Sequence, residues 1–112
     1  MRALLITSFD AAPQLSALQD RLPGQGEVRV RIMACGLNFA DLLMMQGRYQ
    51  DMPSLPFTPG LELSGVIEAI GPETGSLPVG TRVALFSGQG GLAETGCFPA
   101  ERCFAIPDSM NF

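Results

Sequence analysis

The stretch ACGLNFADLLMMQGRY (residues 34–49), followed by PFTPGLELSG (residues 56–65), is the most informative part of this sequence. It is largely apolar, and the polar side chains that interrupt it include Asn38, Asp41, Arg48, Tyr49 and Glu62. A polar group that is buried in such a run needs a hydrogen-bond partner or a ligand. We therefore expect the functional site to lie in this part of the chain.

A short helix is expected inside this stretch. Asn38 suits the N-cap position, Asp41 then lies in the first turn, and apolar residues follow at helical spacing until about Gly47. From the residues alone, Asn38 and Asp41 are interpreted as groups that cap and orient this helix. No other segment is as good a helix candidate.

The helix is followed by an extended connection, because Pro53, Pro56 and Pro59 are incompatible with a regular helix or a central strand. Glu62 lies just beyond it and is interpreted as a hydrogen-bond acceptor that holds the loop. Tyr49 is harder to explain by packing, since a tyrosine in a loop often presents its hydroxyl at a cleft.

The rest of the chain predicts a mainly β protein. Thirteen glycines and nine prolines separate short runs with strand character. We expect strands at residues 2–8, 15–19, 27–35, 61–70, 82–86, 92–98 and 104–106. Asp108 or Ser109 has the character of a helix cap, although no helix follows within the sequence, so we expect a domain boundary there.

Composition excludes several classes of function. The 112 residues are enough for one domain, and no apolar run reaches the ~18 residues of a membrane span. The net charge is −4 and the seven basic residues, all arginines, are scattered, so nucleic acid is not an expected partner. The N-terminus does not resemble a secretory signal, and we expect a cytoplasmic protein.

The residues for metal binding or nucleophilic catalysis are largely missing. The chain has no histidine and no CxxC pair, so neither a structural zinc site nor a Ser-His-Asp or Cys-His arrangement is expected. The three cysteines, Cys35, Cys97 and Cys103, are interpreted as packed thiols, with a disulfide between Cys97 and Cys103 as the alternative.

Gly88, Gly90 and Ala93 fit the dinucleotide-binding pattern G-x-G-x-x-A. The residues that follow have strand and turn character, whereas this pattern should open a helix. We therefore expect a tight connection between antiparallel strands instead.

Five motifs in order make the chain resemble a known family. ACGLNFADLLMMQGRY, PFTPGLELSGVIEAIG, VGTRVALF, GGLAE and FAIPDSMNF are similar to the N-terminal, GroES-like catalytic domain of the medium-chain dehydrogenase/reductase superfamily. The resemblance covers nearly the whole chain. It implies a partly open, GroES-like β-barrel with one or two short helices over residues 1–112, and a cofactor-binding Rossmann domain after residue 112.

Two positions separate the chain from the zinc alcohol dehydrogenases of that superfamily. Those enzymes carry a cysteine at the position of Asn38 and a histidine at the position of Leu61, next to the shared Glu62. The resemblance is therefore to the zinc-free quinone oxidoreductase branch, also called zeta-crystallin-like. The segment at residues 34–42 is also close to the vesicle amine transport protein branch, so the branch stays open.

The resemblance implies that the complete protein transfers hydride from NADPH to a quinone without a metal. It implies catalytic roles for Asn38 and Tyr49, cofactor contacts for Asn38 and Phe39, and supporting roles for Asp41 and Glu62. An enone or enal as substrate, NADH as cofactor, and a non-enzymatic interaction module remain alternatives. It also leaves open a homodimer of the complete protein, and it implies that residues 1–112 alone are inactive.

Overall fold

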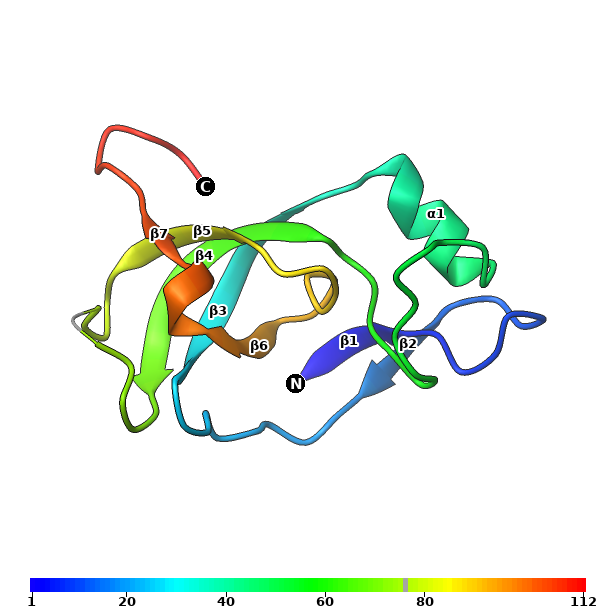
Figure 1. Cartoon of the computed structure of the whole chain (residues 1–112), viewed down its shortest axis with the longest axis horizontal. Coiled ribbons are helices and arrows are strands. Elements are labelled where there is room, and N and C mark those ends of the chain that lie inside the picture. The colour runs from blue at the N-terminus through cyan, green and yellow to red at the C-terminus, as the bar shows by residue number, and fades with distance from the viewer. Residues whose placement is uncertain (76) are drawn as a thin grey trace.

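The computed structural model describes residues 1–75 and 77–112. Within them the chain forms two antiparallel sheets, one α-helix and one 3-10 helix (Figure 1). In chain order the elements are β1 (Arg2–Leu5), β2 (Gln14–Ala17), β3 (Glu27–Gly36), α1 (Phe39–Met45), β4 (Glu62–Ile70), β5 (Arg82–Phe86), β6 (Thr95–Pro99), η1 (Ala100–Arg102) and β7 (Phe104–Ala105).

The larger sheet has the strand order β6-β3-β4-β5-β7, and β1 and β2 pair with each other in the smaller one. In Figure 1 the five-stranded sheet fills one half of the molecule and α1 lies at the other end. The result is the mainly β, partly open barrel that the sequence predicts.

The core of the five-stranded sheet follows from alternation along its central strands. Val28 and Val30 of β3 are fully buried, whereas the arginines between and after them lie on the other face. β4 contributes Ile67 to the same core, and a register shift between Arg29 and Val30 bends the β3–β4 pair. The buried cluster consists of Val28, Val30, Leu63, Ile67, Val83, Leu85, Phe98, Ala100 and Cys103.

A second, smaller apolar cluster lies beneath α1. It contains Ile6, Met44, Phe57 and Leu61. Ile6 and Phe57 also exchange backbone hydrogen bonds, of 2.8 and 3.1 Å, so the segment after β1 pairs with the proline-held connection. The helix therefore rests on two extended segments that come from distant parts of the sequence.

The strand predictions are confirmed within a few residues of each boundary, but the connection at residues 87–94 is not the tight turn that was expected. β5 and β6 are separated in the sheet by β4 and β3, so this connection crosses the end of the sheet. No helix follows it, because the chain continues directly into β6. At the end of the chain, residues 107–110 form a turn closed by the Met110 N–H, which donates to the Pro107 carbonyl over 3.0 Å.

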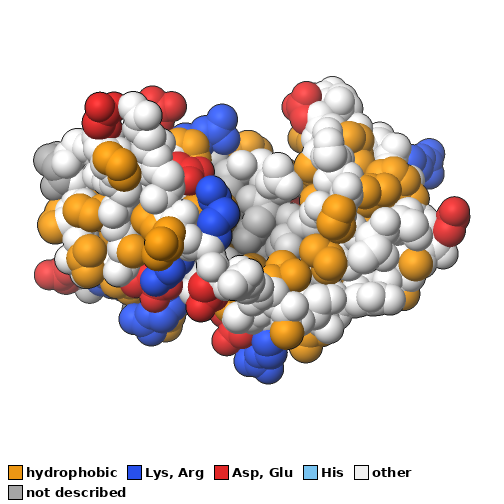
Figure 2. Space-filling view, turned by 90° about the horizontal axis from the view of Figure 1, so that it is seen from below, with side chains coloured by type: hydrophobic (Ala, Val, Ile, Leu, Met, Phe, Trp, Pro, Cys, Tyr) orange, Lys and Arg blue, Asp and Glu red, His pale blue; other side chains and the backbone are white. Residues whose placement is uncertain are grey.

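The surface carries charges of both signs. On the face that Figure 2 shows, acidic and basic side chains lie close together, and the molecule is hollowed between its two halves. The described residues of this face form no continuous basic area. Among the residues that the structure describes, no helix combines the length and apolar character that a membrane crossing requires.

Candidate functional site

The site begins at the N-terminus of α1. Asn38 is the N-cap residue, with an extended backbone (φ −124°, ψ 156°), and Phe39 begins the helix. Asp41 follows in the first turn, and only 2% of its surface is exposed. A buried carboxylate requires hydrogen-bond donors, so the contacts of Asp41 define how the site is held.

Asp41 joins the helix to the loop before β4. Its Oδ2 accepts a hydrogen bond of 2.8 Å from the Asn38 backbone N–H, and its Oδ1 accepts one of 3.1 Å from the Gly60 backbone N–H. The first bond closes the end of the helix, and the second reaches 19 residues along the chain. One side chain therefore fixes the position of Asn38 relative to Gly60 and Leu61.

The loop at Gly60 is also in close contact with the connection at residues 87–94. Gly60 has φ +112°, and a Cβ on it would lie 2.7 Å from Gly91 Cα and from Leu92 N. The Gly91 N–H donates to the Gly60 carbonyl over 3.0 Å, and the Leu92 N–H donates to the Pro59 carbonyl over 2.9 Å. The glycines of this connection therefore allow two backbone segments to approach each other, and they do not form a phosphate-binding turn.

Ser87 completes the support of this loop. Its hydroxyl is 3.3 Å from the Gly60 carbonyl oxygen and 3.2 Å from the Leu61 carbonyl oxygen, and its backbone N–H donates to the Leu61 carbonyl over 2.7 Å. The Leu61 carbonyl is consequently held by Ser87, and Leu61, 5% exposed, packs into the cluster beneath α1.

A cavity of about 500 Å³ opens beside this loop. It brings Tyr49, from the segment after α1, together with Leu61 and with Phe86 and Ser87 at the end of β5. Tyr49 also packs against the apolar cluster beneath the helix. The cavity thus combines aliphatic and aromatic walls with polar side chains, namely the Tyr49 phenol, Gln50, Asp51, Ser87 and Gln89, and such a mixture suits a small, partly polar molecule.

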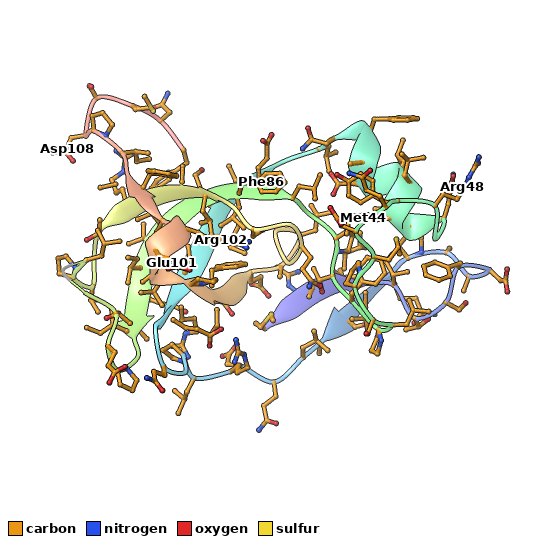
Figure 3. All side chains as sticks on the ribbon, viewed as in Figure 1. Met44, Arg48, Phe86, Glu101, Arg102 and Asp108 are labelled. Atoms are coloured by element: carbon orange, nitrogen blue, oxygen red, sulfur yellow. The ribbon has the colours of Figure 1, made fainter. Side chains whose placement is uncertain are left out.

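Phe86 is a member of this site that the sequence analysis did not identify. Its ring is 60% exposed, and Figure 3 shows it at the end of β5, between the sheet and α1. The alternation of apolar residues along β5 could have identified it. Val83 and Leu85 are buried, so Phe86 must project from the opposite face of the strand.

Asn38 and Phe39 do not line the same cavity as Tyr49. Phe39 lies on the surface of α1, and its ring is 73% exposed. An exposed aromatic ring beside a polar N-cap residue is available to pack against a planar group such as a nicotinamide. In the described ranges, the glycine-rich segment at residues 88–91 leads into β6 and opens no helix, unlike the dinucleotide-binding pattern, in which the glycines lead into a helix.

Glu62 does not hold the loop as expected, because that role belongs to Asp41. The Glu62 carboxylate is exposed and makes no hydrogen bond to the part of the chain that the structure describes. Successive residues of an extended chain point to opposite sides. Leu61 and Leu63 are buried, so Glu62 between them points to the exposed side. It lies over Gly36, where an added Cβ would clash with Glu62 Oε1.

Cys35 lies near the site but is a poor nucleophile. Burial, together with the negative charges of Asp41 and Glu62, raises the pKa of the Cys35 thiol to about 11. The thiol is therefore protonated at neutral pH. Cys97 and Cys103 are also free thiols whose pKa is raised by burial, so a disulfide between them is not present.

The side chain at position 61 has no donor atom for a metal ion. Leu61 provides no ligand atom, and its side chain is buried among apolar neighbours. Over residues 1–75 and 77–112, no three or more Cys, Asp or Glu side chains are grouped so that they could hold a metal ion.

The chain matches a known domain family over most of its length. The model of the "Alcohol dehydrogenase GroES-like domain" matches residues 24–108. A human relative, "Synaptic vesicle membrane protein VAT-1 homolog-like", is 38% identical over 114 aligned residues. This alignment covers 100% of the chain and 27% of the relative. "Quinone oxidoreductase-like protein 2 homolog" of Nematostella vectensis is 44% identical over 90 residues, which are 80% of the chain and 25% of that protein.

Solved structures have the same fold. The human VAT-1 homolog-like protein superimposes with a TM-score of 0.87 at 37% identity, over 100% of this chain and 37% of that one. The quinone oxidoreductase of Thermus thermophilus, also solved in complex with NADPH, gives a TM-score of 0.84 at 34% identity. That alignment covers 99% of this chain and 34% of the other. The chain thus spans roughly a third or less of the length of these relatives. It belongs to the alcohol dehydrogenase GroES-like domain family, and its structural neighbours include quinone oxidoreductases of the medium-chain dehydrogenase/reductase superfamily.

Proposed function

We propose that the complete protein is an NADPH-dependent quinone oxidoreductase that needs no metal, and that residues 1–112 form its substrate-binding and catalytic domain. The observation that carries this proposal is the cavity shared by Tyr49, Leu61 and Phe86. It offers an aliphatic and an aromatic wall from Leu61 and Phe86 together with polar groups that include the Tyr49 and Ser87 hydroxyls, and a flat quinone can use both. A cytoplasmic location is part of the same proposal.

Each residue has a distinct part in this proposal. Leu61 and Phe86 contact the faces of the quinone ring and exclude water. The Tyr49 hydroxyl donates a hydrogen bond to one quinone oxygen and stabilises the negative charge that develops there. Asn38 and Phe39 orient the nicotinamide at the N-terminus of α1. NADPH, when bound, supplies the hydride.

Asp41 acts indirectly in this proposal, through its bonds to the Asn38 and Gly60 backbone. It keeps the two sides of the site at a fixed separation, which matters because hydride transfer depends on close positioning. Glu62 supports the outer side of the site and does not react. A metal is not required, since the conjugated carbonyls of a quinone accept hydride readily.

The proposal includes a second domain. We expect a Rossmann domain after residue 112 to bind the phosphates of NADPH and to form any homodimer, and the glycine-rich segment at residues 88–91, which leads into β6, is consistent with this. The isolated 1–112 fragment should then neither turn over substrate nor bind NADPH at micromolar concentration. Calorimetric titration of the fragment with NADPH tests this, and micromolar binding would contradict it.

The reaction is tested by assaying the complete protein with NADPH and NADH against a panel of quinones and enones. Reduction of quinones with NADPH supports the proposal. Selective reduction of enones would instead favour the alternative of a double-bond reductase, and loss of activity on treatment with a chelator would contradict a metal-free site.

Tyr49→Phe tests the role of the hydroxyl. We expect kcat with a quinone to fall by about tenfold, with little change in the KM for NADPH, since one hydrogen bond to the developing oxyanion is lost. Phe39→Leu is the matched comparison and should raise the KM for NADPH more than it lowers kcat. Unchanged kinetics in Tyr49→Phe would remove Tyr49 from the site.

A second candidate function is a non-enzymatic interaction module. The similarity to VAT-1 homolog-like proteins, over the whole chain, is the observation that favours it. Fold alone does not decide between the two. A complete protein that binds no nicotinamide cofactor and reduces neither quinones nor enones would support the module.

A further inference from the structure

The last six residues, 107–112, fold back over the outer face of the five-stranded sheet, and we call them the strap. In Figure 1 the strap leaves β7, turns, and ends near β5. Asp108, labelled in Figure 3, lies on its outer bend. Before the strap, β7 is joined to β5 by only two residue pairs, Val83 with Ala105 and Ala84 with Phe104.

Arg82 of β5 holds the strap through three separate contacts. Its Nη1 donates to the Pro107 carbonyl over 3.0 Å, and its Nη2 donates to the Met110 carbonyl over 2.6 Å. Its guanidinium carbon lies 4.3 Å from the centre of the Phe112 ring, within the range of a cation–π interaction. The planar guanidinium suits this task because its donors have a fixed geometry.

These contacts are the main attachment of the strap. Within the described residues, the only hydrogen bonds between residues 107–112 and the rest of the chain are the two from Arg82. Arg82 forms no ion pair with any residue in the described ranges, so its charge is not committed elsewhere. The bond from the Met110 N–H to Pro107 lies within the strap and does not attach it.

The strap closes one side of a cavity of about 560 Å³ on the outer sheet face. The sheet register places small residues side by side there, since Ala34 pairs with Ser64 and Ser64 with Ala84. Glu62 lines another part of the cavity, and the Phe112 ring forms its wall on the strap side. The small side chains leave the space, and Phe112 is the one residue of the strap that lines it.

We propose that Arg82 is a latch that holds the strap closed over this cavity, and that releasing it opens the outer face of the sheet beside Glu62. The argument depends on the contacts of one side chain and not on the proposed reaction. Removal of the guanidinium should therefore free residues 107–112 and leave the paired strands intact.

Hydrogen exchange of the complete protein, measured by mass spectrometry, tests the latch. Arg82→Met should speed exchange in the peptide covering residues 108–112 by about tenfold or more, because two charge-assisted hydrogen bonds are lost. Arg82→Lys keeps the charge and one donor, so it should restore part of the protection. Phe112→Leu removes only the ring contact and should have a smaller effect than Arg82→Met.

Arg31→Met is the matched control. It removes the same charge from β3, where the Arg31 side chain is exposed and, within the described residues, makes one side-chain hydrogen bond, to the Met33 sulfur over 3.8 Å. Exchange at residues 108–112 should not change in this variant. Exchange in peptides from β4 shows whether a variant unfolds the whole domain. If Arg82→Met does so, the milder variants Arg82→Lys and Phe112→Leu decide whether Arg82 holds the strap.

Closure of the cavity is tested separately with an introduced thiol. Ser64→Cys is nearly isosteric and places a thiol on the floor of the cavity. Its alkylation by iodoacetamide, followed by peptide mass spectrometry, should be several-fold faster when combined with Arg82→Met than alone, and unchanged when combined with Arg31→Met. Equal exchange at residues 108–112 in wild type and Arg82→Met, or equal alkylation with and without the latch, would overturn the proposal.

Discussion

The two halves of the molecule are stabilised in different ways. Backbone hydrogen bonds join the five strands of the larger sheet, and its core has nine buried residues. Its stability is therefore distributed over many similar contacts. The half around α1 has a helix of seven residues and a core of four. Such a short helix is not stable by itself, and it depends on tertiary contacts.

The difference locates the candidate site. Three segments meet at the site: the loop that carries Leu61, the end of β5 and the start of α1. They are joined by single contacts and not by a ladder of backbone hydrogen bonds. The chief contacts are the hydrogen bonds of Asp41 and the close approach of Gly60 to Gly91. The sheet provides a rigid edge for Phe86 and Ser87, while the α1 half provides Asn38, Phe39 and Tyr49. Substitutions should therefore act globally in the sheet and locally around α1.

The largest effect is expected in the sheet. Ile67→Ala, in the core of β4, should lower the free energy of unfolding by about 4 kcal/mol, through lost burial and an unfilled cavity. Urea unfolding of the complete protein measures the loss, and hydrogen exchange should rise throughout β3, β4 and β5. Ile70→Ala, at the exposed end of the same strand, is the control and should cost about 1 kcal/mol or less. A rise in hydrogen exchange confined to the residues around position 67 in Ile67→Ala would contradict the view that substitutions in the sheet act globally.

Asp41→Ala should cost about 3 kcal/mol, because it leaves the Asn38 and Gly60 backbone N–H groups without their acceptor. Hydrogen exchange should rise in peptides covering residues 39–46 and 58–61, with β3 and β4 little changed. Asp41→Asn keeps the shape of the side chain and one oxygen acceptor, so it should lower the free energy of unfolding by less than Asp41→Ala does.

Asp51→Ala is the control for Asp41, since the Asp51 side chain is exposed and makes no hydrogen bond to the described residues. It should be close to neutral. If Asp41→Ala destabilised β3 and β4 as much as α1, the two halves would form one cooperative unit.

Gly60→Ala should cost about 2 kcal/mol, since the added Cβ meets the backbone of Gly91 and the residue must keep a positive φ. Gly88→Ala in the crossing connection also has a positive φ, of +81°, but its Cβ would meet no atom within 4 Å. It should cost about 1 kcal/mol or less, from φ alone. Thermal unfolding of both variants separates the effect of the close approach from the effect of backbone strain. Equal losses of stability in the two variants would show that the close approach of Gly60 to Gly91 adds nothing to the cost of the substitution.

The last prediction concerns the pH dependence of stability, and its effect appears only in alkaline solution. The pKa of Cys35 is raised from 9.0 to about 11 by burial and by the neighbouring Asp41 and Glu62 charges. The folded protein therefore holds this proton more tightly than the unfolded chain, so the contribution to stability is complete below pH 9 and is lost as the pH rises through about 11. Cys35→Ser should give a shallower decline of unfolding free energy between pH 9 and 11 than wild type. Identical slopes would contradict the assignment.

Local patterns predicted most of the fold. The alternation at residues 27–35 and 61–70 predicted the central strands, and Asn38 followed by apolar residues predicted the one α-helix of the described residues. The prediction of a tight turn at residues 87–94 was wrong, since glycines allow either a tight turn or a close approach to another segment. Glycine spacing alone does not distinguish these, because the partner, Gly60, lies far away in the sequence.

The candidate site was predicted less completely. Tyr49 was singled out because a tyrosine in a proline-held loop is hard to explain by packing, and the structure places it in a cavity with Leu61. Phe86 was missed, although alternation along its strand was sufficient to place it outward. Glu62 was expected to hold the loop, but it is exposed between the buried Leu61 and Leu63, and the Gly60 N–H donates to Asp41 of α1 instead.

The sequence by itself determined the strands, the helix and the side chains available for chemistry, because these depend on the period of apolar residues and on local backbone preferences. It also determined that no histidine is present among the 112 residues. Only the tertiary structure decided which distant residues meet: Asp41 with Gly60, Gly60 with Gly91, and Arg82 with the strap. Those contacts join segments far apart in the chain, and no local pattern encodes them, since they arise when the sheet and the α1 half pack together.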